Sequence, residues 1–139
     1  MKASEIFKRG GYILPATPDG KPLYKDSESG RIRDRARLLE KYNQGVTRFI
    51  FRPCTAGFIG IDCDIKNGKN GFQELVNIIG YDPRKYFHTL TPSSGYHFYF
   101  FTDNTDYVSL EIKPGLEIKH RAFLTIAGSQ SNKGKYTPK

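Results

Sequence analysis

Apolar residues along the chain fall into short runs separated by clusters of Gly, Pro, Ser, Asn and Asp. Helical spacing predicts helices over 3–9, 31–44 and 72–79, and it places Ile32, Ala36, Leu39 and Tyr42 on the buried stripe of the second. Alternating or continuous apolar runs predict strands over 12–14, 46–51, 57–65, 88–91, 96–101, 108–112 and 116–127. Strands outnumber helices and the helices fall between them, so the pattern predicts an α+β fold with helices packed on one side of a sheet.

Two aspartates alternate with apolar residues in the predicted strand 57–65. Residues two apart in a strand point to the same face, so Asp62 and Asp64 share a face with Gly60. Two neighbouring carboxylates repel each other unless a cation lies between them, and hard ions such as Mg²⁺ or Mn²⁺ prefer carboxylate oxygens. The pattern favours a metal site over a solvent-facing polar edge, and Gly60 is expected to let a ligand approach the backbone.

Three further segments carry polar residues that suit a phosphate site. In 91–97 a turn of small residues leads to His97, whose imidazole would either contact phosphate or pack in the sheet. Glu117 and Lys119 point the same way, as a metal ligand beside a phosphate clamp or as a surface salt bridge. The tail 127–136 is small, polar and basic, and either lines a phosphate pocket or is a solvated terminus.

The composition narrows the class of protein. A chain of 139 residues suits one domain, and 37% hydrophobic with 26% charged residues is a globular mix. Lys and Arg number 22 against 14 Asp and Glu, a net charge of +8. This charge fits a polyanionic partner such as nucleic acid, or simply a basic soluble surface. Arg48, Arg52 and the cluster 31–37 are candidates for contact with a nucleic-acid backbone, or part of a solvated face.

The location of the protein is constrained by its cysteines and N-terminus. Cys54 and Cys63 match no zinc pattern and favour reduced thiols in the cytosol. The first nine residues carry charge where a signal peptide needs an apolar core, and no apolar run approaches the ~18 residues of a membrane span. We therefore expect a cytoplasmic protein without a membrane partner.

Taken in order, these motifs resemble the bifunctional primase–polymerase (prim-pol) domain of the archaeo-eukaryotic primase superfamily. Residues 61–64 match the family's acidic strand, and 91–97 match its small-residue turn and histidine. Glu117 and Lys119 match its third acidic residue and the basic residue that follows it. Segments 11–15, 20–23, 127–129 and 134–136 match its opening and closing patterns. The resemblance implies one catalytic domain over 1–139, complete or trimmed from a longer protein. It also implies an RRM-like mixed sheet with helices packed on it and a small N-terminal αβ portion.

The resemblance also implies an activity, template-directed nucleotidyl transfer by a DNA primase or DNA polymerase. It implies that Asp62, Asp64 and Glu117 hold two Mg²⁺ or Mn²⁺ ions and that His97 completes the catalytic set. The implied nucleotide-binding residues are Ser93, Ser94, Gly95, His97, Lys119, Ser129 and Lys135. The implied partners are nucleoside triphosphates, a DNA template and primer, and a helicase in the same or another chain, in the replication of a plasmid, phage or other mobile element.

Three other functions stay open from the residues alone. A metal-dependent nuclease would use Asp62 and the Glu117-x-Lys119 pair, but it gives Asp64 and His97 no task. A non-catalytic nucleic-acid-binding module would use the aromatic strands for base stacking. A replication initiator would need a histidine cluster, and the 3 histidines of this chain are scattered along the sequence.

Overall fold

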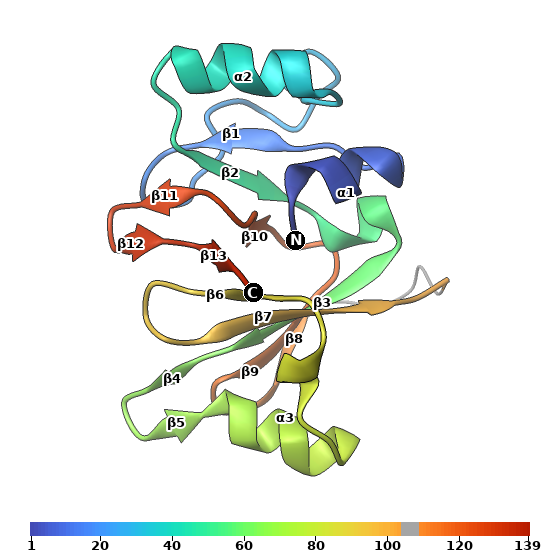
Figure 1. Cartoon of the computed structure of the whole chain (residues 1–139), viewed down its shortest axis with the longest axis vertical. Helices are drawn as coiled ribbons and strands as arrows, with labels where there is room; N and C mark the ends of the chain where they lie inside the picture. Colours follow the sequence, from blue (N-terminus) through green and yellow to red (C-terminus); the bar gives the residue numbers. More distant parts are fainter. Residues whose placement is uncertain (104–108) are drawn as a thin grey trace.

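The computed structural model describes residues 1–103 and 109–139, and its central feature is a pair of stacked β-sheets (Figure 1). The larger sheet contains, in spatial order, β13 (Thr137–Pro138), β6 (His88–Leu90), β7 (Tyr96–Phe101), β3 (Phe58–Cys63), β9 (Leu116–Lys119) and β8 (Leu110–Lys113). The smaller sheet contains β1 (Leu14–Ala16), β2 (Arg48–Phe51) and β10 (Leu124–Thr125). Two hairpins complete the strands, β4 (Ile65–Lys66) with β5 (Lys69–Asn70) and β11 (Gln130–Ser131) with β12 (Gly134–Lys135).

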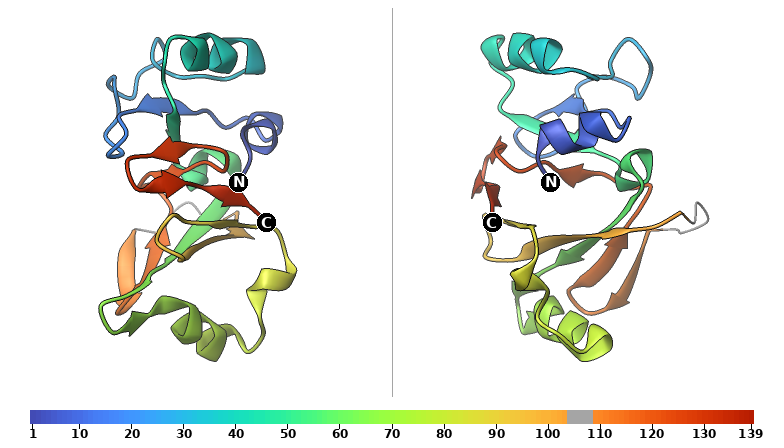
Figure 2. Two further views of the ribbon diagram at one scale, coloured as in Figure 1. Left: turned by 60° about the vertical axis from the view of Figure 1, so that its left-hand side comes forward. Right: turned by 45° about the vertical axis from the view of Figure 1, so that its right-hand side comes forward.

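The helices lie on both sides of the larger sheet rather than on one side. They are α1 (Ala3–Lys8), α2 (Arg35–Asn43) and α3 (Gly71–Ile79), with 3-10 turns η1 (Pro53–Ala56) and η2 (Pro83–Lys85). Figures 1 and 2 show α3 below the larger sheet, and the smaller sheet, α1 and α2 above it. The α+β expectation is confirmed, but the expected mixture of parallel and antiparallel strands is not, since every strand pair in the described residues is antiparallel.

The smaller sheet is built from both ends of the chain, so the expected N-terminal αβ portion is not purely N-terminal. β10 pairs with β2 through Leu124 and Phe51, on the side of β2 opposite to β1. The predicted strand 116–127 is thus divided between the two sheets. The first strand was predicted over 12–14, but β1 continues through Pro15, which lies opposite Phe49. β1 is an edge strand, where a residue without an N–H is tolerated.

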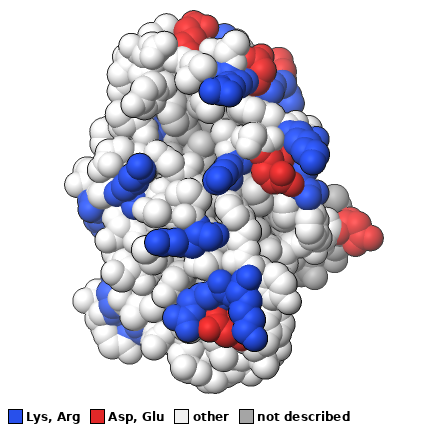
Figure 3. Space-filling model, in the orientation of Figure 1, with Lys and Arg blue, Asp and Glu red and all other residues white. Residues whose placement is uncertain are grey.

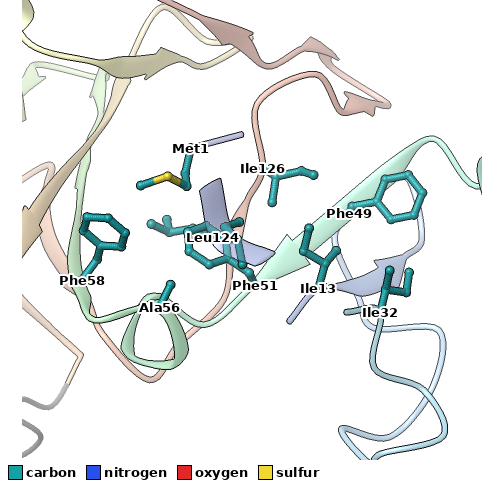
Figure 4. Packing of buried hydrophobic residues seen from close by; sticks show 10 residues of the cluster. Met1, Ile13, Ile32, Phe49, Phe51, Ala56, Phe58, Leu124 and Ile126 are labelled. Atoms are coloured by element: carbon teal, nitrogen blue, oxygen red, sulfur yellow. The ribbon is translucent and has the colours of Figure 1, made fainter. Parts of the chain in front are cut away.

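The largest cluster of buried apolar residues packs the smaller sheet against the larger one (Figure 4). Phe51 and Leu124 of the smaller sheet pack there with Phe58 of β3, and Ile6 of α1 and Met1 close one end. Ile6 and Phe51 have no exposed surface. On the other face of the larger sheet, buried residues of β3, β7 and β9 form a second core cluster with Leu75 of α3. Burial on both faces of β3 fixes its register, because a shift by one residue would bring Asp62 to the α3 side.

The apolar stripe that was expected on helix α2 is not buried in the structure. The helix begins after Asp34, whose side chain accepts a hydrogen bond from the Arg37 N–H at 2.9 Å. Ile32 precedes the helix, bridges to Ile13 and is fully buried, whereas Leu39 and Tyr42 are 45% and 60% exposed. No residue of α2 is buried, so spacing alone misjudged a helix that lies on the outside of the smaller sheet.

Two smaller observations complete the fold. Residue 108, the first of the predicted strand 108–112, lies outside the described residues, and the strand itself is found as β8. Within the described part of the chain, no helix combines the length and apolar character that crossing a membrane requires.

Candidate active site

A row of three polar side chains crosses the middle of the larger sheet. In the strand register, Asp62 of β3 lies opposite His97 of β7 on one side and opposite Glu117 of β9 on the other. Directly opposed residues of neighbouring strands project from the same face. The sheet thus brings the His97 imidazole and the Glu117 carboxylate, which lie 35 and 55 positions after Asp62 in the sequence, to either side of the Asp62 carboxylate.

Asp64 follows this row at the end of β3, where the backbone turns toward the β4–β5 hairpin. Its N–H donates to the Gly115 carbonyl at 2.7 Å, and its own carbonyl accepts from the Gly71 N–H at 2.9 Å. The approach is close: a Cβ on Gly71 would stand 1.8 Å from the Gly115 oxygen. Gly71 therefore allows the start of α3 to meet the β8–β9 turn and fixes the backbone that carries Asp64.

Asp62, Asp64 and His97 line one side of a cavity of about 420 Å³. It opens where the β6–β7 turn, β4 and the β11–β12 hairpin lie on the same side of the molecule (Figure 1). The other lining residues are Asp19, Arg48, Lys66, Thr91, Pro92, Ser93, Ser131, Asn132, Lys133 and Tyr136. The tail 127–136 is therefore packed against the site, and the solvated-terminus alternative is wrong.

Burial and mutual repulsion set the protonation of this row. Burial, followed by the charges of Asp64 and Glu117, raises the pKa of Asp62 to about 7. Burial lowers the pKa of His97 to about 3, so its imidazole is neutral at physiological pH. His97 Nε2 lies 3.5 Å from Asp62 Oδ1, and this contact joins a neutral ring to the carboxyl. A buried carboxyl that is hard to ionise is well placed to gain from a cation in the cavity.

Glu117 lies in the same row but its carboxylate is engaged elsewhere. It forms an ion pair with Lys119, two residues along β9, as expected for side chains that point the same way. In the described residues, neither Glu117 nor Lys119 lines the cavity. Within the same described ranges, no group of three or more His, Cys, Asp and Glu side chains is arranged to hold a metal ion. Of the three predicted metal ligands, the geometry as it stands thus offers two, Asp62 and Asp64, to the cavity, whose lining also includes Asp19.

The small-residue turn before β7 is only partly available to a ligand. The Ser94 N–H donates to the Thr91 carbonyl at 3.1 Å and the Gly95 N–H donates to Thr91 Oγ1 at 3.0 Å, so both amides are used inside the turn. A Cβ on Gly95 would stand 2.3 Å from the Cys63 carbonyl oxygen, so this glycine permits close strand contact. Ser94 adopts a left-handed conformation at φ 64° and is exposed. Ser93 is the serine of this turn that lines the cavity.

Three residues singled out in the sequence lie away from the cavity wall. Ser129 is buried, with its hydroxyl bonded to the backbone of Phe49, and Lys135 is exposed on β12. A Cβ on Gly60 would stand 2.3 Å from Leu124 Cδ1. Gly60 therefore makes room for the packing of the smaller sheet, and the expectation that a ligand approaches there is wrong.

Arg48 and Tyr136 belong to the cavity wall. Tyr136 lies in the tail 127–136, for which a phosphate pocket was one of the two predictions, whereas Arg48 was predicted as a contact for a nucleic-acid backbone or as part of a solvated face. The Arg48 guanidinium donates to the Pro18 carbonyl at 2.9 Å, to Thr125 Oγ1 at 2.9 Å and to the Tyr136 hydroxyl at 3.2 Å. The Tyr136 ring lies 5.7 Å from that of His97. Only the pairing of β2 with β10 brings Arg48 to this place, and no local signal predicts that pairing.

Two comparisons with known proteins bear on this arrangement. The family model described as "Bifunctional DNA primase/polymerase, N-terminal" matches residues 3–139. The match covers nearly the whole chain and includes the acidic strand, the turn before β7, β9 and the closing hairpin. A comparison with curated proteins found no match.

Proposed function

Since the chain belongs to the bifunctional DNA primase/polymerase N-terminal family, we propose that its cavity is the active site of a DNA-directed nucleotidyltransferase. The observation that carries the proposal is the register of β7, β3 and β9, which aligns His97, Asp62 and Glu117 on one face beside Asp64. Each motif is weak alone. The acidic strand, the turn before β7 and the closing hairpin converge on one cavity with Lys66 and Lys133 at its wall, which supports a site for an anionic, metal-bound substrate.

The chemistry of the donors fits a hard divalent cation. Asp62 and Asp64 present carboxylates to one cavity, and burial, followed by the charge of Asp64, raises the pKa of Asp62, so a cation there would stabilise its ionised form. We propose that these two residues hold Mg²⁺ or Mn²⁺, and that Glu117 joins them when its carboxylate leaves Lys119. Two such ions, when bound, would lower the pKa of the attacking 3′-hydroxyl and stabilise charge on the leaving pyrophosphate.

The remaining residues of the wall would bind and orient the nucleoside triphosphate. Lys66 and Lys133 supply positive charge, and the Ser93 hydroxyl supplies a hydrogen-bonding group. Arg48 is held by three oxygen partners and so offers a fixed guanidinium. The neutral imidazole of His97 supports the Asp62 carboxyl and packs against Tyr136, which fits a positioning role.

The proposal gives only indirect roles to three residues that do not line the cavity, Lys119, Ser129 and Lys135. Lys119 neutralises Glu117 and would be freed for phosphate if that carboxylate turned to a metal. Ser129 supports the hairpin that bears the cavity residues, and Lys135 would reach the nucleotide only from the exposed strand β12. The proposals that the protein replicates plasmid, phage or other mobile DNA, and that it works with a helicase, rest on the family alone.

Primer extension with a labelled primer, template, nucleoside triphosphates and Mg²⁺ or Mn²⁺ tests the proposal. We expect Asp62→Ala and Asp64→Ala to abolish extension while circular dichroism shows an unchanged fold, because both carboxylates would hold the metal. Glu40→Gln, an exposed change on α2, is the matched control and should extend normally. Full extension by both aspartate variants would overturn the proposal. Incubation with labelled DNA and metal but no nucleotides separates the nuclease alternative, which predicts shortened DNA.

A further inference from the structure

A second and larger cavity, of about 570 Å³, lies at the other end of β7 from the candidate active site. It is bounded by α1 and the first residues of the chain, by η2 and its flanks, and by the last residues of β7 (Figure 1). Its walls are mainly aromatic. The aromatic residues of the lining include Phe58, Tyr81, Tyr86, Phe87, Tyr99 and Phe101, and we call this cavity the aromatic groove.

Four of the rings of the aromatic groove are largely exposed. Phe101 is 70% exposed and Tyr86 67%, and Tyr81 and Phe87 are also more than two-fifths exposed. Clustered exposed apolar rings in a folded protein mark a binding surface. The rings are also held in place: Phe101 contacts Phe58 with centroids 4.8 Å apart, and Phe87 stacks on Tyr99 at 6.4 Å. The surface is therefore preorganised for flat ligands.

The charges at the rim of the aromatic groove are mainly positive. Arg9 places its guanidinium 4.3 Å from the Phe101 centroid and 4.7 Å from that of Phe58. Lys2 also lines the groove, whereas Glu5, the acidic residue of the lining, is bonded to Arg9 at 2.9 Å. Figure 3 shows Lys and Arg side chains gathered over α1 and over η2 on this face, with acidic side chains among them in both places. A basic rim around stacked rings is complementary to a single-stranded polyanion with flat bases.

The aromatic groove is aligned with the candidate active site along one strand. His97, Tyr99 and Phe101 alternate on β7 and so point to the same face of the sheet. The backbone distance from His97 to Phe101 is about 13 Å, the length of about four nucleotide steps of a stacked strand. A strand seated in the groove would therefore lie within a few nucleotides of the cavity that contains Asp62.

We propose that the aromatic groove binds single-stranded DNA and holds the template strand a few nucleotides from the site of synthesis. The template role rests on the proposed function, whereas the binding itself does not. Bases would stack on Tyr86 and Phe101, and the phosphates would pass Lys2 and Arg9. Duplex DNA presents no free base faces and is expected to bind this groove more weakly.

Fluorescence anisotropy of a labelled oligothymidylate, without nucleotides or metal, tests this proposal. Stacking on an aromatic side chain predicts that Tyr86→Ala or Phe101→Ala weakens binding about 5- to 100-fold. Tyr86→Phe keeps the ring and should bind like the wild type. Tyr42→Ala is the matched control, because Tyr42 is 60% exposed on α2, remote from the groove, and its loss should leave binding unchanged. Both groove side chains are mostly exposed, so thermal melting should be unaffected.

The results separate this proposal from the proposed function. If Tyr86→Ala and Phe101→Ala bind oligothymidylate as tightly as Tyr42→Ala does, the groove proposal is overturned, and a protein partner becomes the occupant to seek. If the wild type binds DNA through these rings but cannot extend a primer, the groove proposal holds and the proposed function fails.

Discussion

Replacement of Asp62 by asparagine should stabilise the metal-free protein, although it removes a residue placed at the active site. The pKa of the Asp62 carboxyl rises from 3.8 to about 7, chiefly through burial and then through the charge of Asp64. At about 1.4 kcal/mol for each tenfold change in proton affinity, this rise corresponds to about 4 kcal/mol. The side chain keeps 23% of its surface exposed, so solvent screening reduces the effect to roughly 2 kcal/mol.

The sign of the effect follows from the direction of the pKa change. Because the folded protein holds the proton of Asp62 more tightly than the unfolded chain does, stability falls as the pH rises from about 4 through about 7. Asparagine has a similar shape and carries no charge, so Asp62→Asn avoids this loss. For a chain of 139 residues, roughly 2 kcal/mol raises the midpoint of thermal unfolding by about 5–10 °C.

Thermal unfolding in EDTA, followed by circular dichroism at pH 5 and pH 8, measures this difference. The advantage of Asp62→Asn should be larger at pH 8 than at pH 5. Added Mn²⁺ should stabilise the wild type at pH 8 and should have little effect on the variant, since a ligating carboxylate must be ionised. Glu40→Gln controls for the loss of a surface charge. A variant less stable than the wild type at both pH values would refute the electrostatic reasoning.

Two further predictions concern the packing of Gly71 near Asp64 and the ion pairs of Asp26 with Arg31 and Arg52. Gly71→Ala should destabilise the fold by more than about 2 kcal/mol in urea unfolding, because its Cβ would stand 1.8 Å from the Gly115 oxygen; wild-type stability would contradict that packing. Burial raises the pKa of Asp26, but hydrogen bonds from Tyr12, Arg31 and Arg52 outweigh it and lower the pKa to about 2. Asp26→Asn should therefore cost roughly 1–2 kcal/mol at pH 6 and progressively less as the pH falls toward 2, and a cost independent of pH would contradict this interpretation.

Local sequence patterns predicted the elements better than they predicted their environment. The helices near residues 3–9 and 72–79, the acidic strand and the aromatic strand are found close to the expected ranges, because alternation and capping residues act within a few positions. The apolar spacing of α2 did not tell which face is covered, and Leu39 remains 45% exposed. Coverage depends on which distant segment packs against a helix.

In the candidate site, too, some features follow from the local sequence pattern and others only from the register of the strands. The alternation around Asp62 and Asp64 is readable from the chain, and so is the shared direction of Glu117 and Lys119. The alignment of His97 with Asp62 depends on strand pairing over a separation of 35 residues, which only the assembled sheet specifies.

The sequence by itself determined the short elements, the basic character and the order of the motifs, because each depends on neighbouring residues. Only the tertiary structure decided that β10 would join β2 and bring Arg48 to the cavity. It also decided that Gly60 would accommodate Leu124 and that exposed rings on both sides of η2 and at the end of β7 would meet beside α1 in one groove. These outcomes arise from packing between segments far apart in the chain, where burial and close backbone approach select the partner.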